Sequence, residues 1–198
     1  MYKMQFLSRR NAGLELAAKL KPMIVYAPVV FGIPGGGMTM AHEVAEGLSA
    51  PAYSILVRKL GVPGHDQLSM GAISSEVQFL DRAVIDRLGV AESAVSKVVD
   101  KEKLELQRQN EGYLRKYGRA SINGKAVVLV DEGIAENFNN IQVAAETLRG
   151  QNPRQLFVAA PVVSAEAVDR LFEEGFRLIW LYMPDPFISI DHWYDQQQ

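Results

Sequence analysis

Two acidic residues, Asp131 and Glu132, stand side by side directly after the four apolar residues VVLV. An apolar run of this kind is typical of a buried strand, so the two carboxylates come where burial ends and a site can begin. Carboxylates at such a place suit the hydroxyl groups of a ribose or a hydrated magnesium ion. The alternative interpretation is that the two acids only begin a turn.

A second candidate is the glycine cluster Gly35, Gly36 and Gly37, which follows a predicted strand at residues 24–32. Consecutive glycines let backbone N–H groups converge on an anion, and the N-terminus of the next helix adds a partial positive charge. The segment GIPGGGM has neither the lysine nor the hydroxyl of a P-loop. It therefore indicates either an anion-binding turn or a plain tight turn.

A basic pair, Arg58 and Lys59, follows a predicted strand at residues 53–57. Basic residues at the end of a strand can meet a phosphate, while the alternative is an ordinary solvated face. The other reactive residue types indicate little. The three histidines show no zinc spacing, and the absence of cysteine excludes disulfides and thiolate chemistry.

Apolar periodicity predicts the elements that position these residues. Strands are predicted at residues 24–32, 53–57, 126–130, 156–163 and 178–182. Helices are predicted at residues 10–21, 81–88 and 94–117. Three more are predicted from apolar residues that share one helical face, at residues 40–48, 141–148 and 167–172. Glycines and short β-like runs between residues 60 and 80 predict a mobile loop and a hairpin.

Alternating apolar strands and amphipathic helices predict an α/β fold with a parallel sheet covered on both faces. The carboxyl ends of parallel strands meet at one edge, where ligands bind. We therefore expect the glycine cluster, the basic pair and the two acids to share one site for an anionic ligand.

Composition favours one globular domain over residues 1–198, with 48% apolar residues, 22% charged residues and a net charge of −2. A net charge this close to zero does not indicate the excess of positive charge that binding to nucleic acid or an anionic membrane requires. The N-terminal sequence has no signal-peptide pattern, and the longest apolar run is broken by Pro28. We expect a cytoplasmic protein that binds neither nucleic acid nor membrane.

Several motifs, taken in order, resemble those of the type I phosphoribosyltransferases, and most closely the bacterial branch of unassigned specificity. They are GIPGGG, VRKLGVPGHDQLSMGAI, VVLVDEGIA, LRGQNPRQLFVAAPV and MPDPFISIDHWYD, which together cover nearly the whole chain. The resemblance implies a central parallel sheet flanked by helices, with a small hood. The family uses magnesium to bind 5-phosphoribosyl-1-pyrophosphate (PRPP), transfers its ribose phosphate to a nitrogenous base, and releases pyrophosphate. The resemblance also implies a homodimer.

The same resemblance implies a role for each matching segment. Gly35, Gly36 and Gly37 would form the pyrophosphate loop, and Asp131 and Glu132 would be the ribose acids. Arg58 and Lys59 would be the basic pair beside the flexible loop, with Lys59 offsetting developing charge. The loop for the 5'-phosphate would consist of Ala135, Glu136, Asn137, Phe138, Asn139 and Asn140. Residues 184–198 would form the hood, in which Trp193 and Tyr194 either stack on a base or simply pack the C-terminus.

The chain departs from the family pattern at these same positions. Gly35 stands where this branch usually has arginine, Glu132 where it has aspartate, and Gln67 where it has glutamate. The phosphate loop usually reads A-T-G-A-T, and here it contains Glu136 and Phe138. A carboxylate about 4 Å from a phosphate costs about 4 kcal/mol per charge pair at the effective dielectric of a protein surface. We hypothesise that Glu136 occupies the place of the phosphate as an internal mimic.

Two functions therefore stay open. The first is a divergent phosphoribosyltransferase-fold protein with weak or lost PRPP-dependent transfer and a retained binding or regulatory role. The alternative is an active Mg²⁺-dependent phosphoribosyltransferase whose base is unidentified. Either function implies a phosphorylated sugar or a nucleotide-like ligand.

Overall fold

The computed structural model describes residues 6–117, 120–135 and 138–194. The chain divides into two compact units. The first consists of Met1–Ile55, Ile122–Phe138 and Leu148–Gln198, and the second consists of Leu56–Ser121 and Asn139–Thr147. Each unit has a sheet and a hydrophobic cluster of its own.

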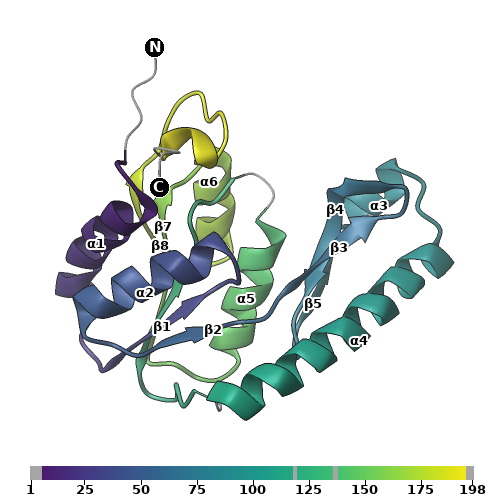
Figure 1. Ribbon diagram of the computed structural model, residues 1–198. Coiled ribbons are helices and arrows are strands. Elements are labelled where there is room, and N and C mark those ends of the chain that lie inside the picture. The colour runs from purple at the N-terminus through teal and green to yellow at the C-terminus, as the bar shows by residue number, and fades with distance from the viewer. Residues whose placement is uncertain (1–5, 118–119, 136–137, 195–198) are drawn as a thin grey trace. The chain divides into compact units, whose positions relative to one another are not determined.

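The first unit contains a five-stranded sheet in which all neighbouring strands are parallel (Figure 1). Its order is β2-β1-β6-β7-β8, and the strands are β1 (Pro28–Gly32), β2 (Ala52–Ser54), β6 (Ala126–Val130), β7 (Gln155–Val162) and β8 (Arg177–Tyr182). The direction of winding reverses between β1 and β6. Such a switch point is where doubly wound sheets bind ligands.

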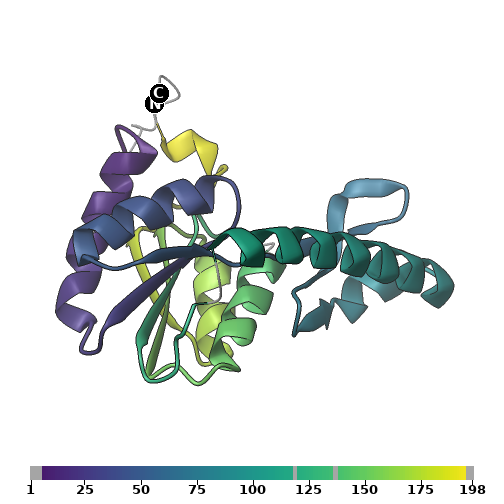
Figure 2. The same ribbon diagram turned by 60° about the horizontal axis from the view of Figure 1, so that its bottom comes forward.

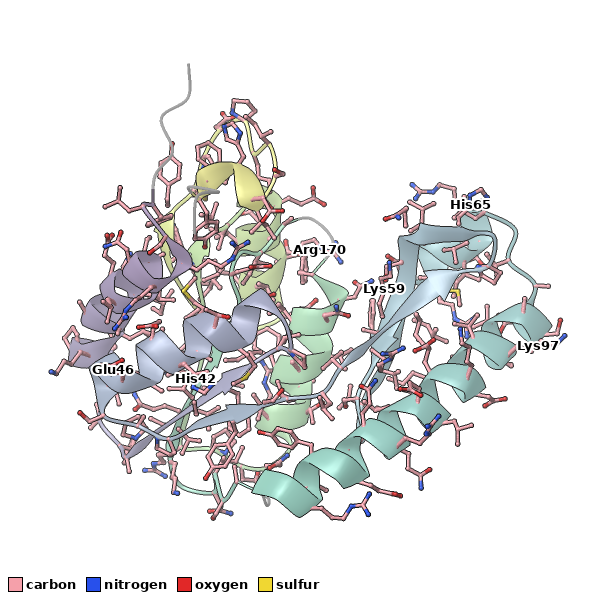
Figure 3. All side chains as sticks on the ribbon, in the orientation of Figure 1. His42, Glu46, Lys59, His65, Lys97 and Arg170 are labelled. Atoms are coloured by element: carbon pink, nitrogen blue, oxygen red, sulfur yellow. The ribbon has the colours of Figure 1, made fainter. Side chains whose placement is uncertain are left out.

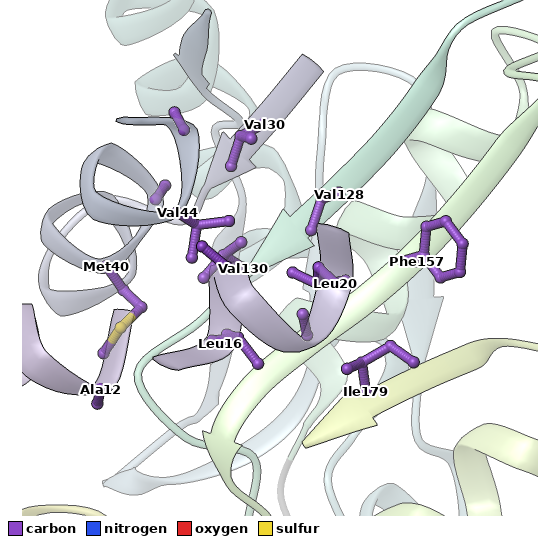
Figure 4. Packing of buried hydrophobic residues seen from close by; sticks show 14 of the residues in the cluster. Ala12, Leu16, Leu20, Val30, Met40, Val44, Val128, Val130, Phe157 and Ile179 are labelled. Carbon is purple, nitrogen blue, oxygen red and sulfur yellow. The ribbon is translucent and has the colours of Figure 1, made fainter. Parts of the chain in front are cut away.

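Helices cover both faces of this sheet (Figure 2). The helices α1 (Arg9–Leu20) and α2 (Gly36–Leu48) pack on one face, and α6 (Ala165–Glu173) packs against β8. Short 3₁₀ helices η1 (Lys21–Met23) and η2 (Asp191–Trp193) follow α1 and β8. The first cluster is built from alternate strand residues and from the apolar stripes of α1 and α2, including Leu16, Leu20, Val30, Met40, Val44, Val128 and Val130 (Figure 4).

The second unit contains a three-stranded antiparallel sheet, β3 (Arg58–Val62), β4 (His65–Ile73) and β5 (Gln78–Leu80). The helices α3 (Arg82–Arg87) and α4 (Glu92–Tyr117) pack on it around a cluster that includes Leu60, Met70, Ile85 and Val95. Helix α5 (Asn139–Arg149) contributes its residues up to Thr147 to this unit. The hydroxyl oxygens of Ser74 and Thr147 lie 2.6 Å apart and share a buried hydrogen bond.

The predicted α/β fold with a parallel sheet covered by helices is confirmed, and so are the predicted helices near residues 10–21 and 94–117. The prediction of a single domain is not tested by the division into two compact units. Along the described ranges, no helix combines the length and the apolar character needed to cross a membrane.

Several predicted boundaries are wrong. Strand β2 ends at Ser54 because its pairing partner β1 ends at Gly32, so Arg58 and Lys59 do not follow that strand but begin β3. Strand β1 begins at Pro28, paired with the first residue of β6, and the preceding Val25 is apolar but exposed. The hairpin predicted between residues 60 and 80 is present, but it belongs to a three-stranded antiparallel sheet that begins at Arg58.

Candidate functional site

The glycine turn and the acidic loop meet in the first unit. Strands β1 and β6 end together, with Gly32 paired to Val130, and each is followed at once by one of these segments. Gly36 and Gly37 are the first two residues of α2. The glycines and the two acids therefore lie together as expected, and their binding of a ligand stays a prediction.

The acids fill the space that side chains would need at these glycines. A Cβ atom on Gly36 would lie 1.7 Å from Glu132 Oε2, and one on Gly37 would lie 2.9 Å from Asp131 Oδ1. Gly35 has a φ of +108°, a backbone conformation that L residues rarely adopt. The run of glycines is thus needed for both the turn and the close approach of the carboxylates.

Asp131 is partly buried at the end of β6, where its Oδ1 accepts a hydrogen bond from the backbone N–H of Glu132 at 2.9 Å. Burial raises the pKa of Asp131 from 3.8 to about 7, an effect opposed by this hydrogen bond and reinforced by the nearby Glu132 carboxylate. A carboxyl group that titrates near neutral pH in such a position is typical of a functional site.

The carboxylate of Glu132 is held by Arg9, the first residue of α1. Arg9 Nε donates to Glu132 Oε2 at 2.8 Å, and Arg9 Nη2 donates to Asp191 Oδ1 at 2.8 Å. The guanidinium also lies 5.1 Å from the centre of the Tyr194 ring. Its hydrogen bond to Glu132 is the main cause that raises the pKa of Arg9.

Sequence reasoning missed Arg9 and Asp191. A local signal for Arg9 exists, because α1 begins with two arginines and has no acid in its first turn. Cations at a helix N-terminus oppose the helix dipole. Such a local conflict often marks a residue that serves a tertiary contact.

The C-terminal segment contacts the acidic loop through Tyr194 and Ile190. The Tyr194 hydroxyl donates a hydrogen bond to the backbone oxygen of Glu132, and burial raises the pKa of Tyr194. A Cβ atom on Gly133 would lie 2.8 Å from the side chain of Ile190, so glycine is required there as well. The segment therefore supports the loop that carries both acids.

Trp193 and Tyr194 are both only 1% exposed and belong to the first hydrophobic cluster. The Tyr194 ring stacks on Phe6 at 5.7 Å, and the Trp193 ring meets Tyr182 edge-on at 5.2 Å. These contacts correspond to the packing alternative for the two aromatic residues. Their role in a hood over a base stays a prediction.

The predicted phosphate loop lies partly in helix. Asn139 and Asn140 are the first residues of α5, and Asn139 Nδ2 lies 3.4 Å from Ser69 Oγ within the second unit. Phe138 is 2% exposed and lies under the guanidinium of Arg170, 4.5 Å from the ring centre. Ala135 is partly buried, while Glu136 and Asn137 lie outside the described residues.

Arg58 and Lys59 begin β3 in the second unit. Figure 3 labels Lys59 on this strand. Arg58 binds Glu102 Oε2 through both Nε at 2.8 Å and Nη2 at 2.7 Å, and Glu102 is buried. The charge of Arg58 is thus matched by a carboxylate of α4. A cavity of about 420 Å³ opens beside the pair, and its lining comprises Val57, Arg58, Lys59, Gly61, Lys101 and Glu102.

A magnesium ion fits this donor set only in part. The residues that the structure describes contain no group of three or more acids or histidines arranged to hold a metal ion. Magnesium is usually held by one or two carboxylates together with substrate phosphates. Asp131 suits such a shared site, whereas Glu132 is already bonded to Arg9.

Similar proteins were found among both curated sequences and solved structures. No family model matches the chain. Two curated proteins of Mycobacterium tuberculosis, from strains CDC 1551 / Oshkosh and ATCC 25618 / H37Rv, each named "Putative phosphoribosyl transferase", are 33% identical over 190 residues. These matches cover 96% of the chain but 43% of each relative, so the chain spans less than half of their length.

A crystal structure from Thermus thermophilus matches with a TM-score of 0.79 and 33% identity, covering 98% of this chain and 93% of that one. A hypothetical protein from Neisseria gonorrhoeae, solved with bound ppGpp, matches with a TM-score of 0.53 and 17% identity. That match covers 97% of this chain and 96% of that one, and it shows the fold alone.

The parallel sheet, the glycine turn at its switch point and the adjacent acids define an α/β protein in which these segments lie at the carboxyl ends of the strands, the place where such sheets bind ligands. The chain belongs to the phosphoribosyltransferase family, and its fold is the type I phosphoribosyltransferase fold.

Proposed function

We propose that the protein is a divergent phosphoribosyltransferase that binds a phosphorylated ribose or nucleotide-like ligand, with PRPP-dependent transfer weak or lost. In this proposal it keeps a binding or regulatory role. The observation that carries the proposal is the state of Glu132, one of the two ribose acids expected from the family. Its carboxylate is bonded to Arg9 and lies against Gly36, so the protein itself engages a group that a transferase needs for its substrate.

The charge at the rim also supports weak binding of PRPP. Asp131, Glu132 and Asp191 contribute three carboxylates, and Arg9 is the cation bonded to two of them. Gly35 supplies no positive side chain. One uncompensated carboxylate about 4 Å from a ligand phosphate costs about 4 kcal/mol at a surface dielectric, which weakens binding by roughly two or more decades.

One observation favours the alternative, an active Mg²⁺-dependent enzyme. Asp131 sits beside the N-terminus of α2 at the switch point of the sheet, and its pKa is raised to about 7. In that case Asp131 holds the ribose hydroxyls, and the backbone amides of Gly36 and Gly37 hold the pyrophosphate. Magnesium would supply neutralisation of the pyrophosphate charge, and the base remains to be identified.

Titration calorimetry with PRPP at millimolar Mg²⁺ tests both functions. Ribose 5-phosphate and inorganic pyrophosphate, titrated in parallel, locate the part of the ligand that is recognised. Binding of PRPP without pyrophosphate release across a screen of bases supports the divergent function. Pyrophosphate release with one base supports the enzyme. Absence of PRPP binding at millimolar ligand contradicts the enzyme, and absence of ribose 5-phosphate and pyrophosphate binding as well contradicts both functions.

Two further expectations from the family belong to this proposal. A homodimer is expected, and size-exclusion chromatography with light scattering would measure its mass. A cytoplasmic location is expected as well, and fractionation of cells that carry the natural gene would check it.

A further inference from the structure

The N-terminus of α1 carries two neighbouring arginines with different surroundings. Arg9 and Arg10 both stand in the first turn, where the helix dipole disfavours cations. The Arg10 side chain is 68% exposed, and its Nε lies 3.4 Å from Glu43 Oε2. The Arg9 side chain is 32% exposed and forms two hydrogen bonds of 2.8 Å. The pair thus provides a residue under test and a matched control.

Arg9 joins parts of the chain that are far apart in sequence. Its guanidinium donates hydrogen bonds to Glu132 in the acidic loop and to Asp191 in the C-terminal segment, which lie 123 and 182 residues away in sequence. The planar guanidinium suits this task because it can direct separate N–H groups at two carboxylates while it lies near an aromatic ring, whereas a lysine ammonium is a single point charge. The Tyr194 ring lies 5.1 Å from the guanidinium.

The contact with Glu132 has a direct consequence for the ligand site. The same oxygen, Glu132 Oε2, accepts the bond from Arg9 and lies against Gly36 at the start of α2. Arg9 therefore fixes where this carboxylate sits and neutralises its charge next to the glycine turn. Without Arg9, the uncompensated Glu132 carboxylate would repel any anion bound there.

We propose that Arg9 is a positioning residue of the ligand site, which acts through Glu132 by holding and neutralising its carboxylate beside Gly36. This inference rests on the proposed function, because it takes a phosphorylated ligand such as PRPP to bind at that turn. It extends the site to a residue near the N-terminus, far in sequence from both the acidic loop and the C-terminal segment.

The test is a double-mutant cycle measured by calorimetry with PRPP at millimolar Mg²⁺. The proteins are the wild type, Arg9→Gln, Glu132→Gln, the double variant, and Arg10→Gln as the control with the same loss of charge. We expect Arg9→Gln to weaken PRPP binding about tenfold or more, because one uncompensated charge near a bound anion has an effect of that order. Arg10→Gln should change the affinity less than about twofold, since exposed charges are well screened.

The cycle separates action through Glu132 from direct contact with the ligand. If Arg9 acts through Glu132, Arg9→Gln should weaken PRPP binding much less in the Glu132→Gln protein than in the wild type. The two losses of affinity should differ by about fivefold or more. Additive effects would show that Arg9 meets the ligand directly and would overturn the positioning role. Arg9→Lys keeps the charge without the fork, so it covers the case in which Arg9→Gln does not fold, and it should still bind PRPP more weakly than Arg10→Lys.

Failure of this inference can be told from failure of the proposed function. If the wild type binds PRPP and Arg9→Gln binds it as well as Arg10→Gln does, the inference alone is overturned. If the wild type binds neither PRPP nor ribose 5-phosphate at millimolar ligand, the proposed function is contradicted and the inference is contradicted with it. Unfolding curves in urea confirm that each variant is folded at the temperature of the titration.

Discussion

Replacing Asp131 with asparagine should stabilise the protein, and more so as the pH rises. Burial raises the pKa of this carboxyl from 3.8 to about 7, so ionising it in the folded state is unfavourable. The difference between these two values corresponds to about 4 kcal/mol, which is an upper bound because water penetration weakens such effects. Asparagine keeps an oxygen that can accept the 2.9 Å hydrogen bond from the N–H of Glu132, without the charge.

The sign follows from linkage between protonation and folding. Because the folded-state pKa of Asp131 is raised, its contribution to stability is fully present below the unfolded-state value near 3.8. That contribution is lost as the pH rises through about 7. The stability of Asp131→Asn relative to the wild type should therefore grow by about 2–4 kcal/mol between about pH 4 and about pH 8.

Urea unfolding of both proteins at these two pH values provides the measurement. Comparison at each pH cancels the titration of all other groups, so only the change in the difference matters. A gain that is the same at both pH values would refute the argument, because it would show that the carboxyl is not forced to titrate near neutral pH. PRPP binding by the same variant should be weaker than in the wild type, since a ribose acid is lost.

Four further changes test other parts of the structure. Gly36→Ala should destabilise the protein by about 1–3 kcal/mol, because the new Cβ would lie 1.7 Å from Glu132 Oε2, and urea unfolding measures this. Gly112→Ala, inside α4 with no atom within 4 Å of the new Cβ, should instead stabilise by about 0.5–1 kcal/mol in the same assay. Trp193→Ala should cost about 3–5 kcal/mol, since the ring is 1% exposed, and a stability change near zero would contradict its place in the core. Glu136→Thr should strengthen PRPP binding by about tenfold or more if Glu136 is an internal phosphate mimic, and an unchanged affinity in calorimetry would exclude that role.

Local patterns were enough to predict the order of the main elements. Continuous apolar strands such as 126–130 and one-sided helical patterns such as that of α2 have few competing interpretations, because each must bury an apolar surface. The two acids and the glycine turn were also found, since both directly follow a strand. In these cases the sequence pattern determines only the local structure.

Other features depend on partners that are distant in sequence. Strand β2 is short because β1 ends at Gly32, which the apolar run after Ser54 does not reveal. Arg58 has its charge matched by Glu102 on α4, so its place after an apolar run says little about the ligand it meets. Strand ends and charge pairs are set by tertiary contacts, and a single sequence records only one side of each.

Two departures from the family pattern become one feature in the structure. Glutamate instead of aspartate at position 132 places a carboxylate one methylene farther from the backbone, and this longer side chain lies against Gly36 and is bonded to Arg9. Glycine instead of arginine at position 35 leaves the turn with a φ of +108° and without a cation that would compete with Arg9 for that carboxylate. An arginine at position 35 would be strained in this backbone conformation. Glu132, the turn at Gly35 and Arg9 therefore form one arrangement, in which each residue depends on the other two.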